Sequence, residues 1–335
     1  MRLRVLSEND VRSVLSLADA IDLQSQAFTA LADGQSIEGL RSFAESECPP
    51  GIAIFNPSFL KGGRGYGVKV VSDFYDNRDR DVPRMTALVA LFDGVTGQPR
   101  TVMEGGYLTD VRTGAGTALA ARFLARKDSR EITIFGAGRL ARNQLEALCV
   151  EYAIERVVVA TRSPEKGREF VSRVLGAGDR VPKDIRLVDN RAEAVAEADI
   201  VVCGTTSHNP VFPGTSLRPG TFVVSAGAYA PTMREVDTET IRRASRHVID
   251  SRRDCLDNAG DLQIPHKEGA FVLDRVVEIA DLIAGRAVGR ETNGEITFYK
   301  SMGVPIQDLV TAQFVEERAI DEGIGTLIDI GGDHN

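Results

Sequence analysis

Residues 131–141 read Glu131-Ile-Thr-Ile-Phe-Gly-Ala-Gly-Arg-Leu-Ala141. The first five predict a buried β-strand, and the residues after the glycines predict a helix. In a strand–GxGxxA–helix turn, the first glycine lets the chain turn and the second lets a pyrophosphate approach the backbone. The alanine allows the helix to pack closely on the strand. The stretch therefore predicts a dinucleotide site at the start of this helix, formed by Gly136, Ala137, Gly138, Arg139 and Leu140.

The pattern on both sides of this turn supports that interpretation. Apolar strands alternate with amphipathic helices as far as residue 225, which is typical of a parallel sheet covered on both faces. The predicted strands are 131–135, 156–161, 186–188, 200–203 and 221–225, and the predicted helices are 140–150, 164–174 and 192–198.

The rest of the chain follows a different pattern. Residues 8–34 predict one or two amphipathic helices, and residues 37–107 predict short strands at 51–55, 65–72, 85–92 and 100–105. Helices are predicted again at 113–124 and at about 306–325. We expect an α/β protein in which a Rossmann dinucleotide-binding domain (120–305) is inserted into a discontinuous α+β domain. Residues 1–119 and 306–335 form this second domain, which binds substrate and dimerises.

The second predicted strand ends in Thr161-Arg162-Ser163. A site that prefers NAD has an acidic residue near this position to accept a hydrogen bond from the ribose 2′-hydroxyl. Here a guanidinium between two hydroxyls suits a 2′-phosphate. The sequence favours NADP(H), while NAD(H) stays possible and Arg162 is otherwise a solvated surface residue.

Composition excludes several other classes. The chain has 335 residues, 43% of them hydrophobic, and a formal net charge of −8. An acidic protein lacks the basic face that duplex DNA requires, so no nucleic-acid partner is expected. No apolar run approaches the length of a membrane span. The four cysteines are scattered without metal-ligand spacing, so we expect no metal and a cytoplasmic location.

Several blocks of the sequence resemble the ornithine cyclodeaminase/μ-crystallin family over nearly the whole chain. They are Gly67-Val-Lys69-Val-Val, Leu108-Thr-Asp-Val-Arg112-Thr113-Gly-Ala, Gly136-Ala-Gly138, Cys203-Gly-Thr205-Thr206, Gly227-Ala-Tyr-Ala-Pro231 with Glu235, and Tyr299-Lys-Ser301-Met-Gly303-Val. The resemblance implies a nicotinamide cofactor, a small α-amino or α-imino acid substrate and a homodimer.

The resemblance also implies site residues. Arg41, Lys69 and Arg112 correspond to the family's ligands for the substrate carboxylate, with Arg64 as an alternative to Arg41. Cations that converge on one pocket need an anion, and a carboxylate suits arginine; taken singly, each cation is more often a surface charge. The implied cofactor contacts are Arg112, Thr113, Thr205, Thr206, Ser225, Gly227, Ser301 and Gly303.

One position departs from the family's cyclodeaminases. They carry an aspartate two residues before the proline of the Gly227–Pro231 block, and here that residue is Tyr229. A carboxylate relays protons near neutral pH, whereas tyrosine is a poor base and an adequate acid or hydrogen-bond donor. Tyr229 is either catalytic or packs against the nicotinamide without taking part in proton transfer.

These observations favour a reductase that uses NADPH to transfer hydride to the imine carbon of a cyclic or open-chain α-imino acid. Lys69, or a water ordered by Tyr229, would supply the proton. Phe55, Met85 and Tyr229 are expected to line the pocket wall. The alternatives are an alanine-type dehydrogenase, an ornithine or lysine cyclodeaminase, and a μ-crystallin-like binding protein with little turnover.

Overall fold

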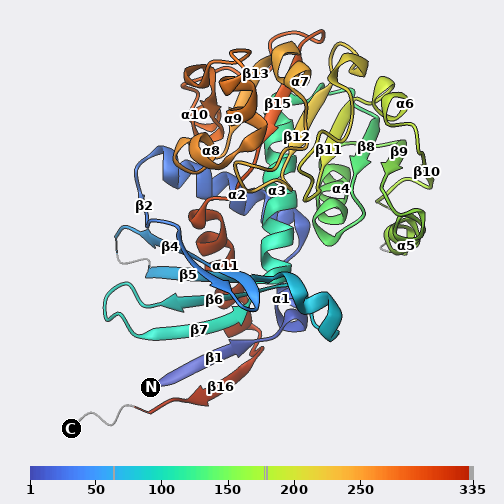
Figure 1. The fold of residues 1–335 in the computed structure, drawn as a ribbon. Helices are drawn as coiled ribbons and strands as arrows, with labels where there is room; N and C mark the ends of the chain where they lie inside the picture. Colours follow the sequence, from blue (N-terminus) through green and yellow to red (C-terminus); the bar gives the residue numbers. More distant parts are fainter. Residues whose placement is uncertain (63–64, 177, 179, 332–335) are drawn as a thin grey trace. The chain divides into compact units, whose positions relative to one another are not determined.

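The computed structural model describes residues 1–62, 65–176, 178 and 180–331 (Figure 1). The chain forms two compact units. Unit 1 contains Met1–Arg112 and Val304–Asn335, and unit 2 contains Thr113–Gly303. Both ends of the chain therefore belong to unit 1.

Unit 1 is built on one largely antiparallel sheet. Its strand order is β16-β1-β7-β6-β5-β4-β2, with β3 also paired to β4, and among the described strands only β1 and β7 pair in parallel. The strands are β1 (Arg2–Leu6), β2 (Ser36–Glu38), β3 (Ser42–Glu47), β4 (Pro50–Leu60), β5 (Gly65–Phe74), β6 (Met85–Phe92), β7 (Pro99–Glu104) and β16 (Thr326–Asp329). The helices are α1 (Glu8–Val14), α2 (Leu17–Ala32), the 3-10 turn η1 (Tyr75–Arg80), α11 (Pro305–Asp321) and the start of α3 (Gly106–Leu124).

Helix α11 covers one face of this sheet and also packs against α2. The start of α2 is fixed by a capping box, in which Ser16 and Asp19 satisfy each other's backbone amides. Its buried side chains include Ile21 and Phe28, and α11 buries Leu309 and Val315 in return. The apolar periodicity of both helices thus forms the core of unit 1.

Unit 2 is a parallel eight-stranded sheet in the order β10-β9-β8-β11-β12-β15-β13-β14. Its strands are β8 (Glu131–Phe135), β9 (Arg156–Ala160), β10 (Asp184–Leu187), β11 (Ile200–Cys203), β12 (Phe222–Ser225), β13 (Ala244–Ile249), β14 (Val277–Glu278) and β15 (Ile296–Lys300). Its helices are the end of α3, α4 (Arg139–Glu151), α5 (Pro164–Leu175), α6 (Arg191–Ala196), α7 (Thr238–Arg243), α8 (Arg252–Asn258), α9 (Gly260–Lys267), α10 (Ile279–Ile283), and the 3-10 turns η2 (Gly214–Ser216) and η3 (Leu273–Arg275).

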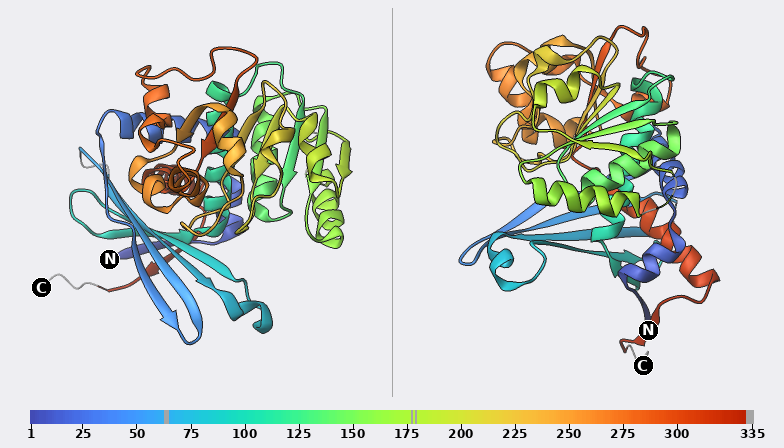
Figure 2. Two further views of the ribbon diagram at one scale, coloured as in Figure 1. Left: turned by 45° about the horizontal axis from the view of Figure 1, so that its top comes forward. Right: turned by 90° about the vertical axis from the view of Figure 1, so that its right-hand side faces the viewer.

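Helices cover both faces of the unit 2 sheet (Figure 2). The central strands β11 and β12 are buried along their whole length, as expected for a parallel sheet enclosed on both sides. Together with the unit 1 sheet, which is assembled from both ends of the chain, this confirms the fold class predicted from the sequence. The sequence did not predict β1, β2, β3, β13, β15 and β16 or the short helices between 238 and 283.

Candidate active site

Three of the predicted cations lie together in unit 1. Lys69 on β5 and Arg112 on α3 are buried, with 4% and 5% of their surfaces exposed. Arg41 donates from Nε to Oδ1 of Asn56 at 2.9 Å, and Asn56 lies opposite Lys69 in the β4–β5 register. The structure therefore brings Arg41, Lys69 and Arg112 together, and Lys69 points away from solvent.

The anion that joins these cations comes from the protein. Asp308 Oδ2 lies 2.7 Å from Lys69 Nζ, and Asp308 Oδ1 lies 2.9 Å from Arg112 Nε. Sequence reasoning missed Asp308, because an acidic residue in the first turn of a helix normally complements the helix dipole. The available signal was its spacing. Asp308 falls on the same helical stripe as the buried residues Ala312, Val315 and Ala319.

Burial and charge shift the pKa values of this pair. Burial and the neighbouring Arg112 lower the pKa of Lys69 to about 7, although Asp308 opposes the shift. Burial alone would raise the pKa of Asp308, but Arg112 and Lys69 more than offset this and hold it below its usual range. Near neutral pH the site therefore contains an ionised carboxylate and a lysine that can give up a proton.

A second buried residue of α11 also reaches Arg112. Gln307 Oε1 accepts from Arg112 Nη1 at 3.4 Å and from the amide of Val304 at 2.8 Å. Gln307 Nε2 donates to Gln24 Oε1 at 2.9 Å, and Gln24 Nε2 donates to Thr311 Oγ1 at 3.2 Å. The first turn of α11 is thus fixed by a buried polar network that satisfies its members.

The predicted pocket wall is not assembled around Lys69. Phe55 pairs with Val70, the neighbour of Lys69 in the strand, so it lies on the opposite face of the sheet. Met85 pairs with Asp73, about 13 Å along β5 from Lys69, and is half exposed. Arg64, the alternative to Arg41, lies outside the described residues.

The glycine turn of unit 2 fits a dinucleotide phosphate. Gly136 has a φ of +112°, and a Cβ there would lie 2.7 Å from the carbonyl oxygen of Gly204, so this position requires glycine. Gly138 is the N-cap of α4 and makes no side-chain cap, and a Cβ there would meet open space. Ala137, Arg139 and Leu140 surround it, and α4 is long enough to present its free amides and dipole to an anion.

The end of β9 leaves an exposed guanidinium. Ser163 accepts a hydrogen bond from the amide of Lys166 and caps α5, and Thr161 Oγ1 accepts from the amide of Ser163 at 3.4 Å. Arg162 between them is exposed. The two hydroxyls therefore shape the turn, while the guanidinium faces solvent.

Two loops at the carboxyl ends of β11 and β12 share one buried carboxylate. Glu235 accepts from the amide and Oγ1 of Thr205 (2.5 and 2.8 Å) and from the amides of Gly227 and Ala228 (2.8 and 3.2 Å). Burial raises the pKa of Glu235, which the positive charge of Lys300 partly offsets. This carboxylate holds the loop that leads to Tyr229, which is partly buried, while Thr206 is exposed.

The sequence predicts that Ser225 contacts the cofactor, but the buried side chain of Ser225 does not make this contact. Its Oγ is fully buried, within hydrogen-bonding distance of Glu235 (2.8 Å) and Asp261 (2.7 Å), and Lys300 Nζ lies 3.1 Å away. Lys300 also pairs with Asp261 at 3.0 Å and donates to the carbonyl of Ala228 at 2.6 Å. Ser225 therefore supports the loops from inside, and no pattern around Asp261 indicated its role in advance.

Asp250 fixes the end of unit 2 in a similar way. Its Oδ2 accepts from Ser301 Oγ at 3.1 Å and from the amides of Met302 and Gly303 at 2.6 and 2.5 Å. Gly303 has a φ of +80°, and Thr113, at the other end of unit 2, is buried. The hydroxyl of Ser301 is directed to this carboxylate.

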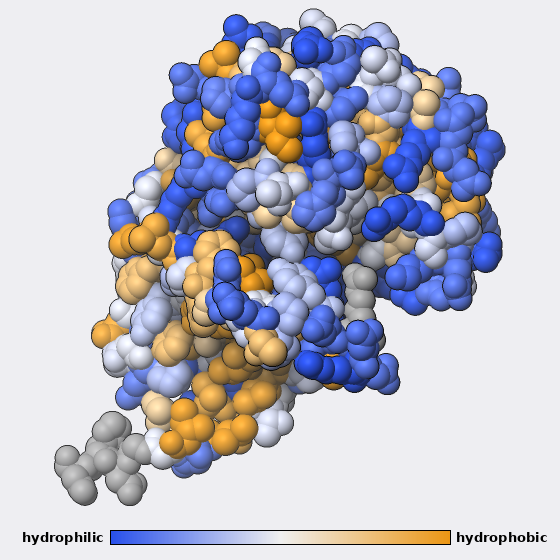
Figure 3. Space-filling model, viewed as in Figure 1, coloured by the Kyte–Doolittle hydropathy of each residue, from blue (hydrophilic) through white to orange (hydrophobic). Residues whose placement is uncertain are grey.

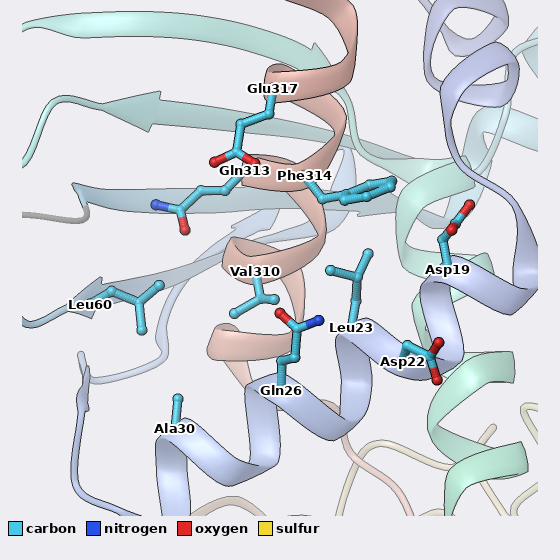
Figure 4. Close-up of a pocket in the computed structure, with 10 residues that line it drawn as sticks. All are labelled: Asp19, Asp22, Leu23, Gln26, Ala30, Leu60, Val310, Gln313, Phe314 and Glu317. Atoms are coloured by element: carbon cyan, nitrogen blue, oxygen red, sulfur yellow. The ribbon is translucent and has the colours of Figure 1, made fainter.

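A groove in unit 1 lies apart from these residues. Its volume is about 400 Å³. Figure 4 shows that side chains of α2, α11 and β4 line it, and Lys69, Arg112 and Asp308 are not among them. In the part of the chain that the structure describes, no helix combines the length and apolar character needed to cross a membrane. Nor do the described residues gather His, Cys, Asp or Glu side chains in a group that could hold a metal ion.

Comparisons with known proteins show similar chains over nearly the whole length. Delta(1)-pyrroline-2-carboxylate reductase from Bacillus cereus is 32% identical over 326 residues, which cover 97% of this chain and 99% of the relative. The Thermococcus litoralis enzyme of that name, solved in complex with NADH and L-proline, has a TM-score of 0.91 and 36% identity, covering 96% of this chain and 99% of that one. An archaeal alanine dehydrogenase dimer with bound NAD has a TM-score of 0.91 and 30% identity, covering 99% and 100% of the two chains.

The family model of ornithine cyclodeaminase/mu-crystallin matches residues 1–323, nearly the whole length. The match includes the glycine turn of unit 2 and the Lys69 and Arg112 blocks of unit 1. The resemblance inferred from the motifs is confirmed, and the chain belongs to the ornithine cyclodeaminase/mu-crystallin family.

Proposed function

We propose that this chain is an NAD(P)H-dependent reductase of small α-imino acids, and that cyclic imines such as Delta(1)-pyrroline-2-carboxylate are its substrates. The observation that carries the proposal is the buried charge of unit 1. Lys69 and Arg112 are buried and share the carboxylate of Asp308, and Arg41 lies close enough to lower the pKa of Lys69. A buried cluster of cationic donors favours an anionic ligand, and the carboxylate of an imino acid supplies it.

The substrate's carboxylate is bound by this cation cluster, and the imine nitrogen is directed to Lys69. When bound, the reduced nicotinamide supplies a hydride that forms the new C–H bond and whose electron pair reduces C=N to C–N. The proton that balances the charge passes from Lys69 Nζ to the nitrogen. A lysine whose pKa is about 7 can perform this step at neutral pH.

The phosphates of the cofactor fit the Gly136–Gly138 turn and the N-terminus of α4. We propose NADP(H) as the preferred cofactor, because Arg162 is exposed beyond β9 and no acidic residue accompanies it in Thr161-Arg162-Ser163. Thr205, Thr206, Gly227, Ser301 and Gly303 belong to the nicotinamide side of this site, with Thr113 and Arg112 at its phosphates. We propose that the unit formed by both ends of the chain is the substrate-binding and dimerisation domain and that the central unit is the dinucleotide-binding domain, with boundaries at 112/113 and 303/304 in place of the expected 119/120 and 305/306.

We also propose that the protein is a homodimer formed through unit 1. The face of its sheet opposite α11 is apolar, with Phe55, Val70 and Leu88 in one cross-strand row. Two rows further along the same face, Tyr66 stacks on Phe59 and Phe92 at ring-centroid distances of 5.6 and 4.8 Å. Figure 3 shows hydrophobic residues gathered over the part of unit 1 that carries this sheet, and such a face favours a partner.

An absorbance assay at the nicotinamide band tests the reaction. NADPH and NADH are each offered with pyrroline-2-carboxylate, piperideine-2-carboxylate, and 2-oxo acids with ammonia or methylamine. We expect rapid oxidation of NADPH with the cyclic imines. Oxidation with pyruvate and ammonia alone would favour an alanine dehydrogenase. Release of ammonia from ornithine or lysine would favour a cyclodeaminase. If neither cofactor is oxidised under any condition, a binding protein is favoured.

A further inference from the structure

The carboxylate of Asp308 is the one group on α11 that contacts both Lys69 and Arg112 in the described structure. Its two oxygens are divided between them, Oδ2 to Lys69 and Oδ1 to Arg112. None of the three side chains is more than 6% exposed, so bulk water does not replace these contacts. Without Asp308, two like charges would face each other in a dry site, which is costly.

We infer that Asp308 is a positioning residue for the reaction: it holds the Lys69 ammonium and the Arg112 guanidinium in one arrangement before substrate binds. This inference rests on the proposed function for its catalytic consequence, and on the unit 1 geometry alone for its structural part. Asp308 does not touch the reacting atoms in this scheme. It acts through Lys69 and Arg112.

The first turn of α11 is built to keep Asp308 in place. Gln307, its neighbour, accepts from Arg112 Nη1, so α11 engages the guanidinium at two points. Glu38 Oε2 accepts from the amide of Ile306 at 3.1 Å and anchors the start of the helix to β2. The N-terminal dipole of a 17-residue helix further favours the ionised carboxylate.

The contacts with Asp308 leave other donors of both cations for substrate. Asp308 takes one N–H of Lys69 and the Nε–H of Arg112. Lys69 has three N–H donors and the guanidinium five. A substrate carboxylate and an imine nitrogen can therefore be added to the same two side chains without displacing Asp308.

The same contact sets the pH range in which Lys69 carries its proton. Burial, Arg112 and Arg41 all lower the pKa of Lys69, and Asp308 raises it. Among the other groups near this site, Glu38 accepts from Ser58 Oγ, Glu104 accepts from the amides of Gly106 and Tyr107, and Asn56 on β4 is neutral. Removal of the Asp308 charge therefore lowers the pKa of Lys69 further.

The test compares Asp308→Asn with Asp308→Glu in the full-length protein. In Asp308→Asn we expect the alkaline limb of the kcat/KM profile for pyrroline-2-carboxylate to move down by at least about one pH unit, so that the loss at pH 8 exceeds the loss at pH 6 by about fivefold or more. Titration of the imine itself is common to all variants and cancels in the comparison. Asp308→Glu keeps the charge, so its limb stays near that of the wild type while its rate falls because the carboxylate is displaced.

Glu316→Gln is the matched control. Glu316 is a buried acidic residue two turns further along α11, where it pairs with Arg100 and Thr101. Its loss should lower thermal stability without moving the pH profile. If kcat/KM of Asp308→Asn falls by the same factor at every pH and the alkaline limb does not move, the loss reflects a damaged structure and the inference is overturned.

A second readout does not depend on turnover. In protein labelled with 13C-lysine, the Lys69 signal is assigned by its absence in Lys69→Met, and its titration is followed by NMR. We expect the midpoint to fall by at least about one pH unit in Asp308→Asn and to stay unchanged in Glu316→Gln. If the wild type reduces no imine, the proposed function fails, yet this titration still decides whether Asp308 controls Lys69. An unchanged midpoint in Asp308→Asn would show that Asp308 does not influence the protonation of Lys69.

Discussion

The Lys69 ammonium lies 2.7 Å from a carboxylate oxygen of Asp308, although the two residues come from opposite ends of the chain. Lys69 lies on β5, a central strand of the unit 1 sheet, and Asp308 lies in the first turn of α11. Burial and the neighbouring Arg112 lower the pKa of Lys69, an amine that would ordinarily stay protonated, to about 7, and Asp308 opposes this shift.

Replacing Lys69 with Met should remove the proton donor while leaving the fold of unit 2 intact. We expect kcat to fall about a hundred- to ten-thousandfold, the usual contribution of a general acid. Stopped-flow absorbance measures the rate, and calorimetry measures cofactor affinity, which should not change. Lys61→Met, at an exposed lysine in the same unit, is the control. Turnover that survives in Lys69→Met would show that Lys69 is not the donor.

The wild-type enzyme should lose activity as the pH rises through about 7. Lys69 must be protonated to act, and its pKa in the folded protein is about 7, so the active form prevails below that pH and declines above it. The kcat/KM profile for imine reduction measures this between pH 5 and pH 9. An alkaline limb near pH 10 would mean that Lys69 behaves as an ordinary exposed lysine.

Glu235→Gln should destabilise unit 2 and weaken cofactor binding. The substitution leaves the buried ammonium of Lys300 with one carboxylate instead of two and turns an amide N–H toward backbone donors. We expect a loss of roughly 3–5 kcal/mol of stability, the usual cost of breaking a buried charged pair. Calorimetry gives both the Tm and the cofactor Kd. Glu239→Gln, which removes a surface pair with Arg242, should change neither by a comparable amount.

Arg162→Ala tests the cofactor preference. If the guanidinium binds the 2′-phosphate, KM for NADPH should rise about tenfold or more while KM for NADH stays the same, because a charge-assisted bond is lost only with NADPH. Steady-state kinetics with both cofactors measure this, and Arg168→Ala on α5 serves as the surface control. A wild-type enzyme that prefers NADH by about tenfold would contradict the proposal at once.

Leu88→Asp tests the dimer. Leu88 lies in the apolar row with Val70 and Phe55, so a charge there should be excluded from any interface formed by this face. Light scattering after size exclusion should show a monomer. Val95→Asp places the same charge on a side chain that is 83% exposed outside the sheet and should leave the dimer intact. A monomeric wild type would remove the basis of the proposal.

Much of the fold could be predicted, because it follows from periodicity. Strands β6, β8 and β11 have the predicted bounds, and Gly136 needs its glycine for the reason inferred from the motif. Strand β3 could not be found in this way, since its residues, Ser42–Glu47, are mostly exposed and polar, and only pairing with β4 makes them a strand.

The candidate site was less predictable, because its decisive contacts join distant parts of the chain. Lys69 and Arg112 lie in recognisable blocks, yet nothing near them in the sequence indicates the carboxylate that they share. Phe55 illustrates the opposite error. It is close to Asn56 in sequence, but alternation along β4 sends the two side chains to different faces of the sheet. Ser225 was misjudged because its burial depends on Glu235, Asp261 and Lys300 together.

The division of unit 1 between both ends of the chain has a consequence for synthesis. Unit 2 is complete once Gly303 has been translated, whereas the Lys69 site still lacks α11 and its carboxylate. Because domains fold as units while the ribosome advances, a nascent chain acquires the dinucleotide fold first and gains its charge-balanced substrate site only after α11 has been added. A chain truncated before Asp308 would therefore be a nucleotide-binding protein with unbalanced cations, and a late premature stop would abolish catalysis as completely as an early one.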